Sequence, residues 1–348
     1  GEYLIICASA DVALFSAYPN VLGVSSFPSL NNSADSIAIA DDFALLIDEV
    51  VYTDDWYQVS EKDGGGYSLE LINPFSPCSS ISNWRASNDA SGGTPGAQNS
   101  IYDDTPDVIA PFITSIETID KQLVYINFSE PVDIDALTLS NFSVASGTAV
   151  VDFVSNNSEN TQLKASLSPA IDTGVVYVLT IDAISDCSGN TASSSGDFVL
   201  PFEARIGDLI INEILFDPYS GGDDFVELYN NSDRAINLQG LHIANEEDGL
   251  IDNEKPIEIY RIINPGEFVV LTEDTANIKA NYLSSIAGTF IETDLPTYAN
   301  DDGVVQLLKK DSSSLDRFAY DSDMHFKLIK DDEGKSLERI DYNRSTDD

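Results

Sequence analysis

The chain has 348 residues, enough for two or three domains at roughly 100 to 200 residues each. It carries 59 Asp and Glu residues against 17 Lys and Arg, which gives a net charge of -42. Phosphate binding requires a basic surface, so this balance argues against a nucleic acid as partner. No apolar run reaches the ~18 to 20 residues of a membrane helix, so we expect no membrane insertion within this chain.

Strand signals run along the whole sequence. Short segments rich in Val, Ile, Tyr and Phe are separated by Gly, Pro, Asn, Asp and Ser, which is typical of strands joined by turns. In chain order the clearest segments are residues 2–9, 35–41, 44–52, 122–129, 175–181, 208–216, 224–230 and 267–273. Helical periodicity is weak and limited to residues 9–20 and 274–285. The sequence therefore predicts an all-β protein.

An internal repeat divides the chain. The segment "GEYLIICASADVALFSAYPN" from Gly1 aligns with "GEFVVLTEDTANIKANYLSS" from Gly266. The alignment continues through three further pairs of segments: 26–39 with 294–307, 47–55 with 315–323, and 64–72 with 332–340. We call residues 1–72 the first copy and residues 266–340 their counterpart in the second copy. The second copy has strands before Gly266 that the first lacks. The first copy is followed by a tail, residues 73–100, that the second lacks. We therefore expect both copies to be partial domains.

A third unit lies between the copies. It follows the linker "IYDDTPDVIAP", whose prolines favour an extended chain. Strands separated by turns at intervals of about 8 to 12 residues then predict a sandwich of roughly immunoglobulin size. The expected architecture is three Ig-like antiparallel β-sandwich units in tandem, over residues 1–103, 104–205 and 206–348.

Several short motifs together resemble the lamin tail domain, an Ig-like sandwich that also occurs in secreted bacterial proteins. They are Asn212–Ile214, Phe225–Leu228, the turn Asn237–Gly240, Pro265–Glu267, and in the first unit Asn83, Trp84 and Gly92–Ser100. On this resemblance the first unit is a lamin tail domain with its N-terminal part missing, and the third is one with its C-terminal part missing. The middle unit, through "VYINFSEPVD", "YVLTI" and "ISDCSGN", resembles a bacterial Ig-like domain of the S-layer type. The resemblance implies a cell-surface or secreted setting and no activity.

Catalytic signatures are scarce in the sequence. His242 and His325 are its two histidines, and neither lies in a recognised catalytic motif. Glu213 and Glu227 stand inside apolar strands, where a carboxylate needs a partner. Pairing with backbone groups or with a cation such as Arg234 is the simpler interpretation, and a catalytic carboxylate pair is the alternative. We expect a protein that is not an enzyme.

Calcium is the cofactor that the acidic turns favour. Hard oxygen ligands gather in two Gly-rich turns, one with Asp217, Asp223 and Asp224, the other with Asn300, Asp301 and Asp302. Asp103, Asp104 and Asp107 of the linker offer further ligands at a domain junction. Neither turn has the spacing of an EF-hand, and Asp, Asn and Gly also fill turns for backbone reasons alone. Both interpretations stay open at this point.

Three cysteines permit at most one disulfide. Cys7 and Cys187 are expected to be small buried residues, and Cys78 to be exposed. Trp84, in a loop rich in Ser, Asn and Gly, is expected to fold that loop onto its sandwich, with stacking on a sugar as the alternative.

The function expected from these features is that of a non-catalytic extracellular or cell-surface module. It would act as a spacer or adhesive unit for a cell-surface polysaccharide or protein, stiffened by calcium. Binding would be carried by loops at the ends of the sandwiches. The alternative is an accessory region of an exported hydrolase, of nuclease or phosphoesterase type, whose catalytic domain lies outside this chain.

Overall fold

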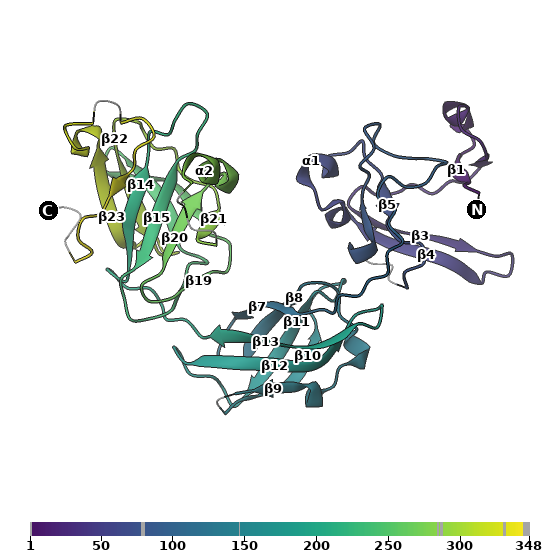
Figure 1. The fold of residues 1–348 in the computed structure, drawn as a ribbon, viewed down its shortest axis with the longest axis horizontal. Helices are drawn as coiled ribbons and strands as arrows, with labels where there is room; N and C mark the ends of the chain where they lie inside the picture. The colour runs from purple at the N-terminus through teal and green to yellow at the C-terminus, as the bar shows by residue number, and fades with distance from the viewer. Residues whose placement is uncertain are drawn as a thin grey trace. The chain divides into compact units, whose positions relative to one another are not determined.

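The computed structural model describes residues 2–77, 81–145, 147–283, 285, 288–329 and 332–343. Its strands, many of them labelled in Figure 1, confirm the all-β class. The chain divides into two compact units. Unit 1 comprises Gly1–Ile116, Gln122–Pro169 and Val178–Asp197; unit 2 comprises Glu117–Lys121, Ala170–Tyr177 and Phe198–Asp348. The division into three sandwiches stays a prediction.

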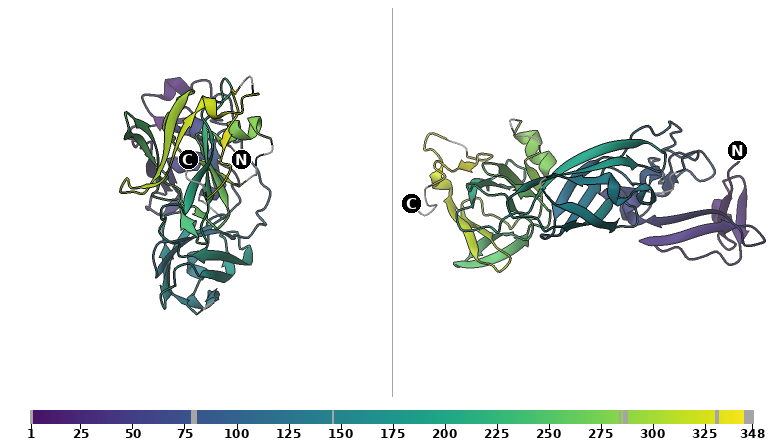
Figure 2. Two further views of the ribbon diagram at one scale, coloured as in Figure 1. Left: turned by 90° about the vertical axis from the view of Figure 1, so that its left-hand side faces the viewer. Right: turned by 90° about the horizontal axis from the view of Figure 1, so that it is seen from below.

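The first copy and the tail that follows it form three separate two-stranded sheets. Parallel β1 (Ile5–Ala8) and β2 (Val21–Val24) make one, antiparallel β3 (Ala34–Ala40) and β4 (Leu46–Thr53) the second, and β5 (Leu69–Leu71) and β6 (Trp84–Ala86) the third. The β3–β4 pair is a long two-stranded ribbon (Figure 2). The short helix α1 (Ser60–Asp63) lies between β4 and β5. Across the described part of residues 2–103, the buried apolar side chains are those of Cys7, Trp56 and Ala86.

The middle of the chain folds into two sheets. One has the order β10-β11-β8-β7 and the other the order β13-β12-β9. Their strands are β7 (Ile113–Thr118), β8 (Leu123–Phe128), β9 (Phe142–Val144), β10 (Ala149–Ser155), β11 (Gln162–Ser168), β12 (Val176–Ser185) and β13 (Thr191–Val199). Buried residues alternate with partly exposed ones along β8 and β11, because successive strand side chains face opposite sides of the sheet.

Two larger sheets form the second copy and the strands before it. The first sheet has the order β21-β20-β15-β14-β24, the second β18-β17-β22-β23, and β16 pairs with β19. Their strands are β14 (Leu209–Leu215), β15 (Phe225–Asn230), β16 (Ile236–Asn237), β17 (His242–Glu247), β18 (Leu250–Pro256), β19 (Ile262–Ile263), β20 (Phe268–Thr272), β21 (Phe290–Glu292), β22 (Asp302–Leu308), β23 (Ser314–Asp321) and β24 (Leu337–Glu338). The helix α2 (Thr275–Asn281) follows β20. One apolar cluster, with members from Ala204 to Tyr320, fills this part of the chain.

A buried amide closes one end of this core. The Asn230 side chain is 0% exposed and donates to the carbonyl oxygens of Arg234 (2.7 Å) and Ile263 (2.8 Å). Its side-chain oxygen accepts from the backbone N–H and the hydroxyl of Ser232. Because every polar atom of this side chain is satisfied, a polar residue is tolerated inside an apolar cluster.

The cysteines differ in part from expectation. Cys7 is free and buried, in agreement with the predicted burial, but Cys187 is exposed and disulfide-bonded, so its predicted burial is wrong. Cys78 lies outside the described residues. None of the helices in the described part of the chain is long and apolar enough to cross a membrane.

Candidate functional site

Three carboxylates from distant parts of the sequence converge in unit 1. Asp107 lies in the linker, Glu130 follows β8, and Asp186 follows β12. One oxygen of each lies within 4.8 Å of the others, and among the described residues this is the group of acidic, histidine or cysteine side chains that could hold a metal ion. Asp107 of the linker thus lies close to the ends of β8 and β12, where the three carboxylates gather.

Burial and repulsion both act on this group. Asp186 is 3% exposed, and its carboxylate accepts from the backbone and the side-chain nitrogens of Asn190, each at 2.8 Å. The side-chain amide of Asn190 also donates to the backbone oxygen of Asp107 at 3.2 Å, which ties the linker to this point. Burial, with the charges of Asp107 and Asp186, raises the pKa of Glu130 to about 7. Without a bound cation, burial and mutual repulsion therefore oppose full ionisation of the three carboxylates at neutral pH.

Sequence reasoning found one of these three carboxylates. Asp107 was predicted together with Asp103 and Asp104, but those two stay outside the group. Asp103 accepts from the Thr105 backbone N–H at 2.9 Å, and Asp104 accepts from the Tyr102 hydroxyl at 3.1 Å. Glu130 and Asp186 were missed. Glu130 directly follows the predicted strand 122–129, and Asp186 lies a few residues beyond the predicted strand 175–181, but acids are common in such turns and carried no specific signal.

The two acidic turns predicted to bind metal meet in unit 2. Asp217 follows β14, Asp223 and Asp224 precede β15, and the Asn300–Asp302 turn leads into β22. The side-chain amide of Asn300 donates to the carboxylate of Asp217, which links the two turns. Asp301 accepts from the backbone N–H of Asp302 at 3.1 Å, and backbone oxygens of the turns accept from more distant residues: that of Asp217 from the Gly334 N–H at 2.7 Å and that of Asp224 from the Thr272 hydroxyl at 2.9 Å. Both the metal and the turn interpretation of these six residues stay predictions.

Asp224 has the most unusual setting of the six. Burial raises its pKa to about 7, and the charges of Asp223, Glu273 and Asp217 act in the same direction. Burial and the charges of Asp274 and Glu273 also raise the pKa of Asp223. The structure therefore adds Glu273 and Asp274, at the end of β20, to the acids that the sequence singled out.

Glu213 and Glu227 lie side by side in one sheet. Strand register places Glu213 of β14 opposite both Glu227 of β15 and Glu338 of β24. Burial, followed by the Glu227 and Glu338 charges, raises the pKa of Glu213 despite a 2.5 Å hydrogen bond from Ser336.

Glu227 accepts from the side chain of Asn212 at 2.7 Å. The expected partner Arg234 instead pairs with Asp208, so that part of the prediction is wrong. The hydrogen bonds themselves agree with the structural interpretation.

Both histidines make structural contacts. His242 Nδ1 lies 2.5 Å from Glu254 of the adjacent strand β18. The two ring nitrogens of His325 lie 3.2 Å from the Ser322 carbonyl and 3.1 Å from the Lys335 carbonyl. Trp84 packs on the buried Trp56, with ring centroids 6.0 Å apart, in agreement with the expected folding of its loop.

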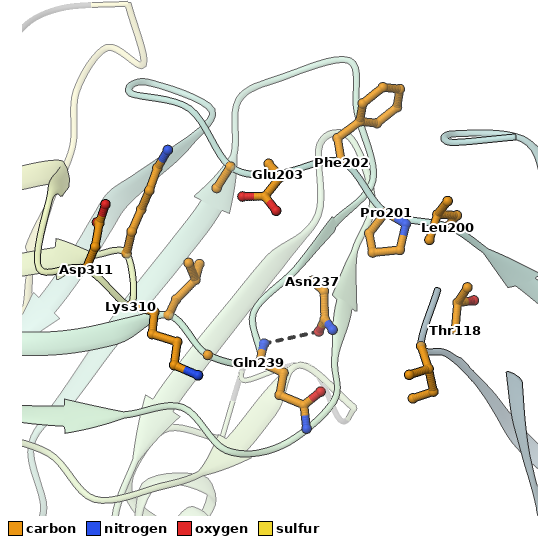
Figure 3. A pocket seen from close by; sticks show the side chains of 14 residues that line it. Thr118, Leu200, Pro201, Phe202, Glu203, Asn237, Gln239, Lys310 and Asp311 are labelled. Atoms are coloured by element: carbon orange, nitrogen blue, oxygen red, sulfur yellow. Dashed lines mark hydrogen bonds between the residues drawn. The ribbon is translucent and has the colours of Figure 1, made fainter. Parts of the chain in front are cut away.

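A pocket of about 800 Å³ opens in unit 2 near the turn between β22 and β23. Figure 3 shows Asn237, Gln239 and Lys310 on one side of it, with the Gln239 backbone N–H donating to the Asn237 side chain at 3.1 Å. The ring of Phe202 points away from these amides and has the Arg234 guanidinium 5.6 Å from its centroid. The pocket therefore offers hydrogen-bonding groups rather than an aromatic platform.

Comparison with known families identifies the unit-2 sheets. Residues 203–322 match the Lamin Tail Domain family model. The match begins before β14 and ends at β23, so it includes most of the strands whose apolar residues form the large core cluster. The resemblance expected from the Asn212–Ile214 and Phe225–Leu228 motifs is confirmed for this part of the chain, which we call the lamin tail domain. No curated protein matches the chain.

Solved structures give more distant similarities. The chain is 13% identical to the N-terminal part of the bacterial S-layer protein SbsC, with a TM-score of 0.26, over 61% of this chain and 44% of that one. It is 16% identical to a DUF4876 family protein from Bacteroides thetaiotaomicron, with a TM-score of 0.24, over 49% of this chain and 64% of that one. The chain therefore spans less than two thirds of either structure.

Proposed function

We propose that the chain is a non-catalytic extracellular spacer and binding module whose linker is fixed by calcium. The observation that carries this proposal is the convergence of Asp107, Glu130 and Asp186 where the linker meets two strand ends. Calcium takes six to eight oxygen ligands, and three carboxylates can supply several of them. A bound cation would offset the repulsion that raises the pKa of Glu130 and would hold the linker in one position.

An extracellular setting is supported by covalent chemistry. Cys187 is disulfide-bonded, and disulfides persist mainly in oxidising compartments such as the cell exterior or the periplasm. A net charge of -42 keeps an exposed protein soluble and attracts cations such as calcium. These features fit a module displayed outside the cell.

A polysaccharide is the partner we propose for the pocket of unit 2. Asn237, Gln239 and Lys310 line it with amide and ammonium groups, and Glu203 and Asp311 add carboxylates. Sugar hydroxyls pair with such groups in both donor and acceptor roles. Binding is expected to weaken when Gln239→Ala and Lys310→Ala are combined, measured by affinity electrophoresis in polysaccharide gels. Lys327→Ala, at an exposed site outside the pocket, is the matched control.

Calcium binding is tested by thermal melts of the full chain in calcium, in magnesium and in chelator at one ionic strength. Calcium at about 100 times its dissociation constant adds ~2.7 kcal/mol to the free energy of unfolding. We expect a calcium-selective rise that is lost in the double variant Glu130→Gln/Asp186→Asn. Asp103→Asn changes a linker acid outside the group and is expected to keep the rise.

Two results would reject the proposed calcium site. One is an equal response to magnesium and calcium, which indicates charge screening alone. The other is a calcium response that survives Glu130→Gln/Asp186→Asn but is lost in Asp224→Asn/Asp301→Asn, which would move the metal to the acidic turns of unit 2.

A further inference from the structure

The same strand hairpin occurs in both copies of the repeat. Residues 26–55 align with 294–323 at a constant offset, which equates β3 with β22 and β4 with β23. The register agrees as well. Ile39 lies opposite Asp48 in the first copy, and its counterpart Leu307 lies opposite Asp316 in the second. The two hairpins therefore present equivalent faces.

These equivalent faces differ sharply in exposure. In the lamin tail domain, five positions of β20, β22 and β23 are at most 2% exposed and belong to one core cluster: Val269, Leu271, Val305, Leu307 and Leu315. Their counterparts in the first copy are Leu4 at 57%, Ile6 at 41%, Ile37 at 36%, Ile39 at 50% and Ile47 at 66% exposed. We call these five residues of the first copy the open face. They lie at β1 and on the β3–β4 hairpin, and large apolar side chains exposed in this way mark an interaction site.

The second copy shows what covers such a face. The same core cluster contains apolar side chains of β14, β15 and β17: Leu209, Ile211, Ile214, Val226, Leu228 and Ile243. These strands come from residues 203–265, and the first copy aligns with residues 266–340 only. The repeat alignment therefore contains no first-copy counterpart of the covering strands.

The strand edges of the first copy also lack the partners that their counterparts have in the lamin tail domain. In the lamin tail domain, β20 pairs antiparallel with β15, and β22 pairs antiparallel with β17. Among the described residues, their counterparts β1 and β3 pair only with β2 and β4, respectively. Each of the two strands thus leaves one row of backbone N–H and C=O groups available. Open edges next to an apolar face are the usual acceptor for added strands.

We propose that the open face is a docking surface for a polypeptide segment with the strand chemistry of residues 203–265. A strand like β15 adds antiparallel to β1, and a strand like β17 adds antiparallel to β3. Their apolar side chains cover Leu4, Ile6, Ile37, Ile39 and Ile47. Docking of this segment converts the first copy into a closed sandwich like the lamin tail domain.

The test supplies this segment to the full chain. A second copy of residues 203–265 is joined directly before Gly1, so that Pro265 precedes Gly1 as it precedes Gly266 in the natural sequence. Hydrogen exchange of the amides of residues 34–53 is then compared with that of the original chain. We expect exchange to slow by about 100-fold, because added partners turn an open ribbon into a cooperative sheet.

A matched control has the same added segment with Leu228→Asp and Ile243→Asp in the added copy alone. We expect residues 34–53 of this control to exchange as fast as in the original chain. The proposal is overturned if the added segment leaves exchange over residues 34–53 unchanged. Equal protection by the original and the Asp-substituted segments would also overturn it, because the contact would then not depend on the apolar strands.

Two further measurements on the original chain identify other occupants. Sedimentation showing a dimer that Ile39→Asp dissociates would assign the open face to a second copy of this chain. Flotation with phosphatidylcholine vesicles that Ile39→Asp abolishes would assign it to lipid. Either result would replace the proposed occupant. A monomer without affinity for vesicles, together with protection by the added segment, supports the proposal.

Discussion

Ile39 and Leu307 hold the same register position in two copies of one hairpin, each opposite an aspartate, yet Ile39 is 50% exposed and Leu307 is 0% exposed. Local sequence explains the shared hairpin, because both segments alternate apolar and polar residues around a turn. The difference in burial arises from β14, β15 and β17, which cover Leu307 from more than 60 residues away in the chain.

This pair predicts two different costs for one substitution. Leu307→Asp places an unpaired charge in a dry core and should unfold the lamin tail domain, at a cost above about 4 kcal/mol. Ile39→Asp should change the free energy of unfolding by less than about 0.5 kcal/mol, since the residue is already in water. Urea unfolding followed by local hydrogen exchange measures both. Similar costs at the two sites would show that the open face is covered in solution.

An ion pair between Asp316 of the lamin tail domain and Arg339, which follows β24, offers a second matched comparison. Asp316 accepts from Arg339 at 3.0 Å and from the backbone N–H of Ile211 at 2.8 Å. The two side chains are 15% and 10% exposed, so Asp316→Ala removes the carboxylate partner of a largely buried guanidinium, at a cost of about 3 kcal/mol, although Arg339 Nε keeps its hydrogen bond to the Ile211 carbonyl at 2.9 Å.

Asp48, the counterpart of Asp316 in the first copy, is exposed, and Asp48→Ala should cost less than about 0.5 kcal/mol. Denaturant midpoints of the two variants provide the measurement. A small loss for Asp316→Ala would mean that the remaining hydrogen bonds of Arg339, among them the one to the Ile211 carbonyl, satisfy its guanidinium without the carboxylate.

Buried carboxylates predict how stability depends on pH in chelator. The pKa values of Glu130 and Asp224 are each raised to about 7 in the folded chain, above their values in the unfolded chain. The folded state therefore holds these protons more tightly, so the free energy of unfolding falls as pH rises from about 4.5 to 7. Glu130→Gln and Asp224→Asn should each flatten this slope, measured as denaturant midpoints between pH 5 and 8.

The pKa of Glu246 is shifted in the opposite direction, downward. Hydrogen bonds from Arg317 lower the pKa of Glu246, so its contribution is present above the unfolded pKa and is lost as pH falls below it. Glu246→Gln should therefore leave the slope between pH 5 and 8 unchanged and serve as the control. A slope that steepens in Glu130→Gln would contradict the assigned direction.

Reduction should destabilise unit 1. Cys187 is disulfide-bonded, and loss of a native disulfide typically costs ~2 to 5 kcal/mol. Dithiothreitol should therefore lower the melting temperature of the chain, and Cys187→Ser should lower it to the same level without reductant. Cys7 is free and buried, so Cys7→Ser should leave the effect of dithiothreitol intact. Titration of three free thiols in denaturant without reductant would rule out the disulfide.

Alternating apolar residues and turn-forming Gly, Pro, Asn and Asp were enough to predict an all-β chain and its repeat, because strands and turns depend on neighbouring residues. The motif around Asn212–Ile214 also identified the lamin tail domain that the family match confirms.

Tertiary structure decided what depends on residues distant in sequence. It brought Asp107, Glu130 and Asp186 to one point, and it buried Leu307 while leaving Ile39 in water. It also paired Arg234 with Asp208 instead of with Glu213 or Glu227. Burial and charge clustering require contacts between chain segments, and no local pattern specifies which segments will meet.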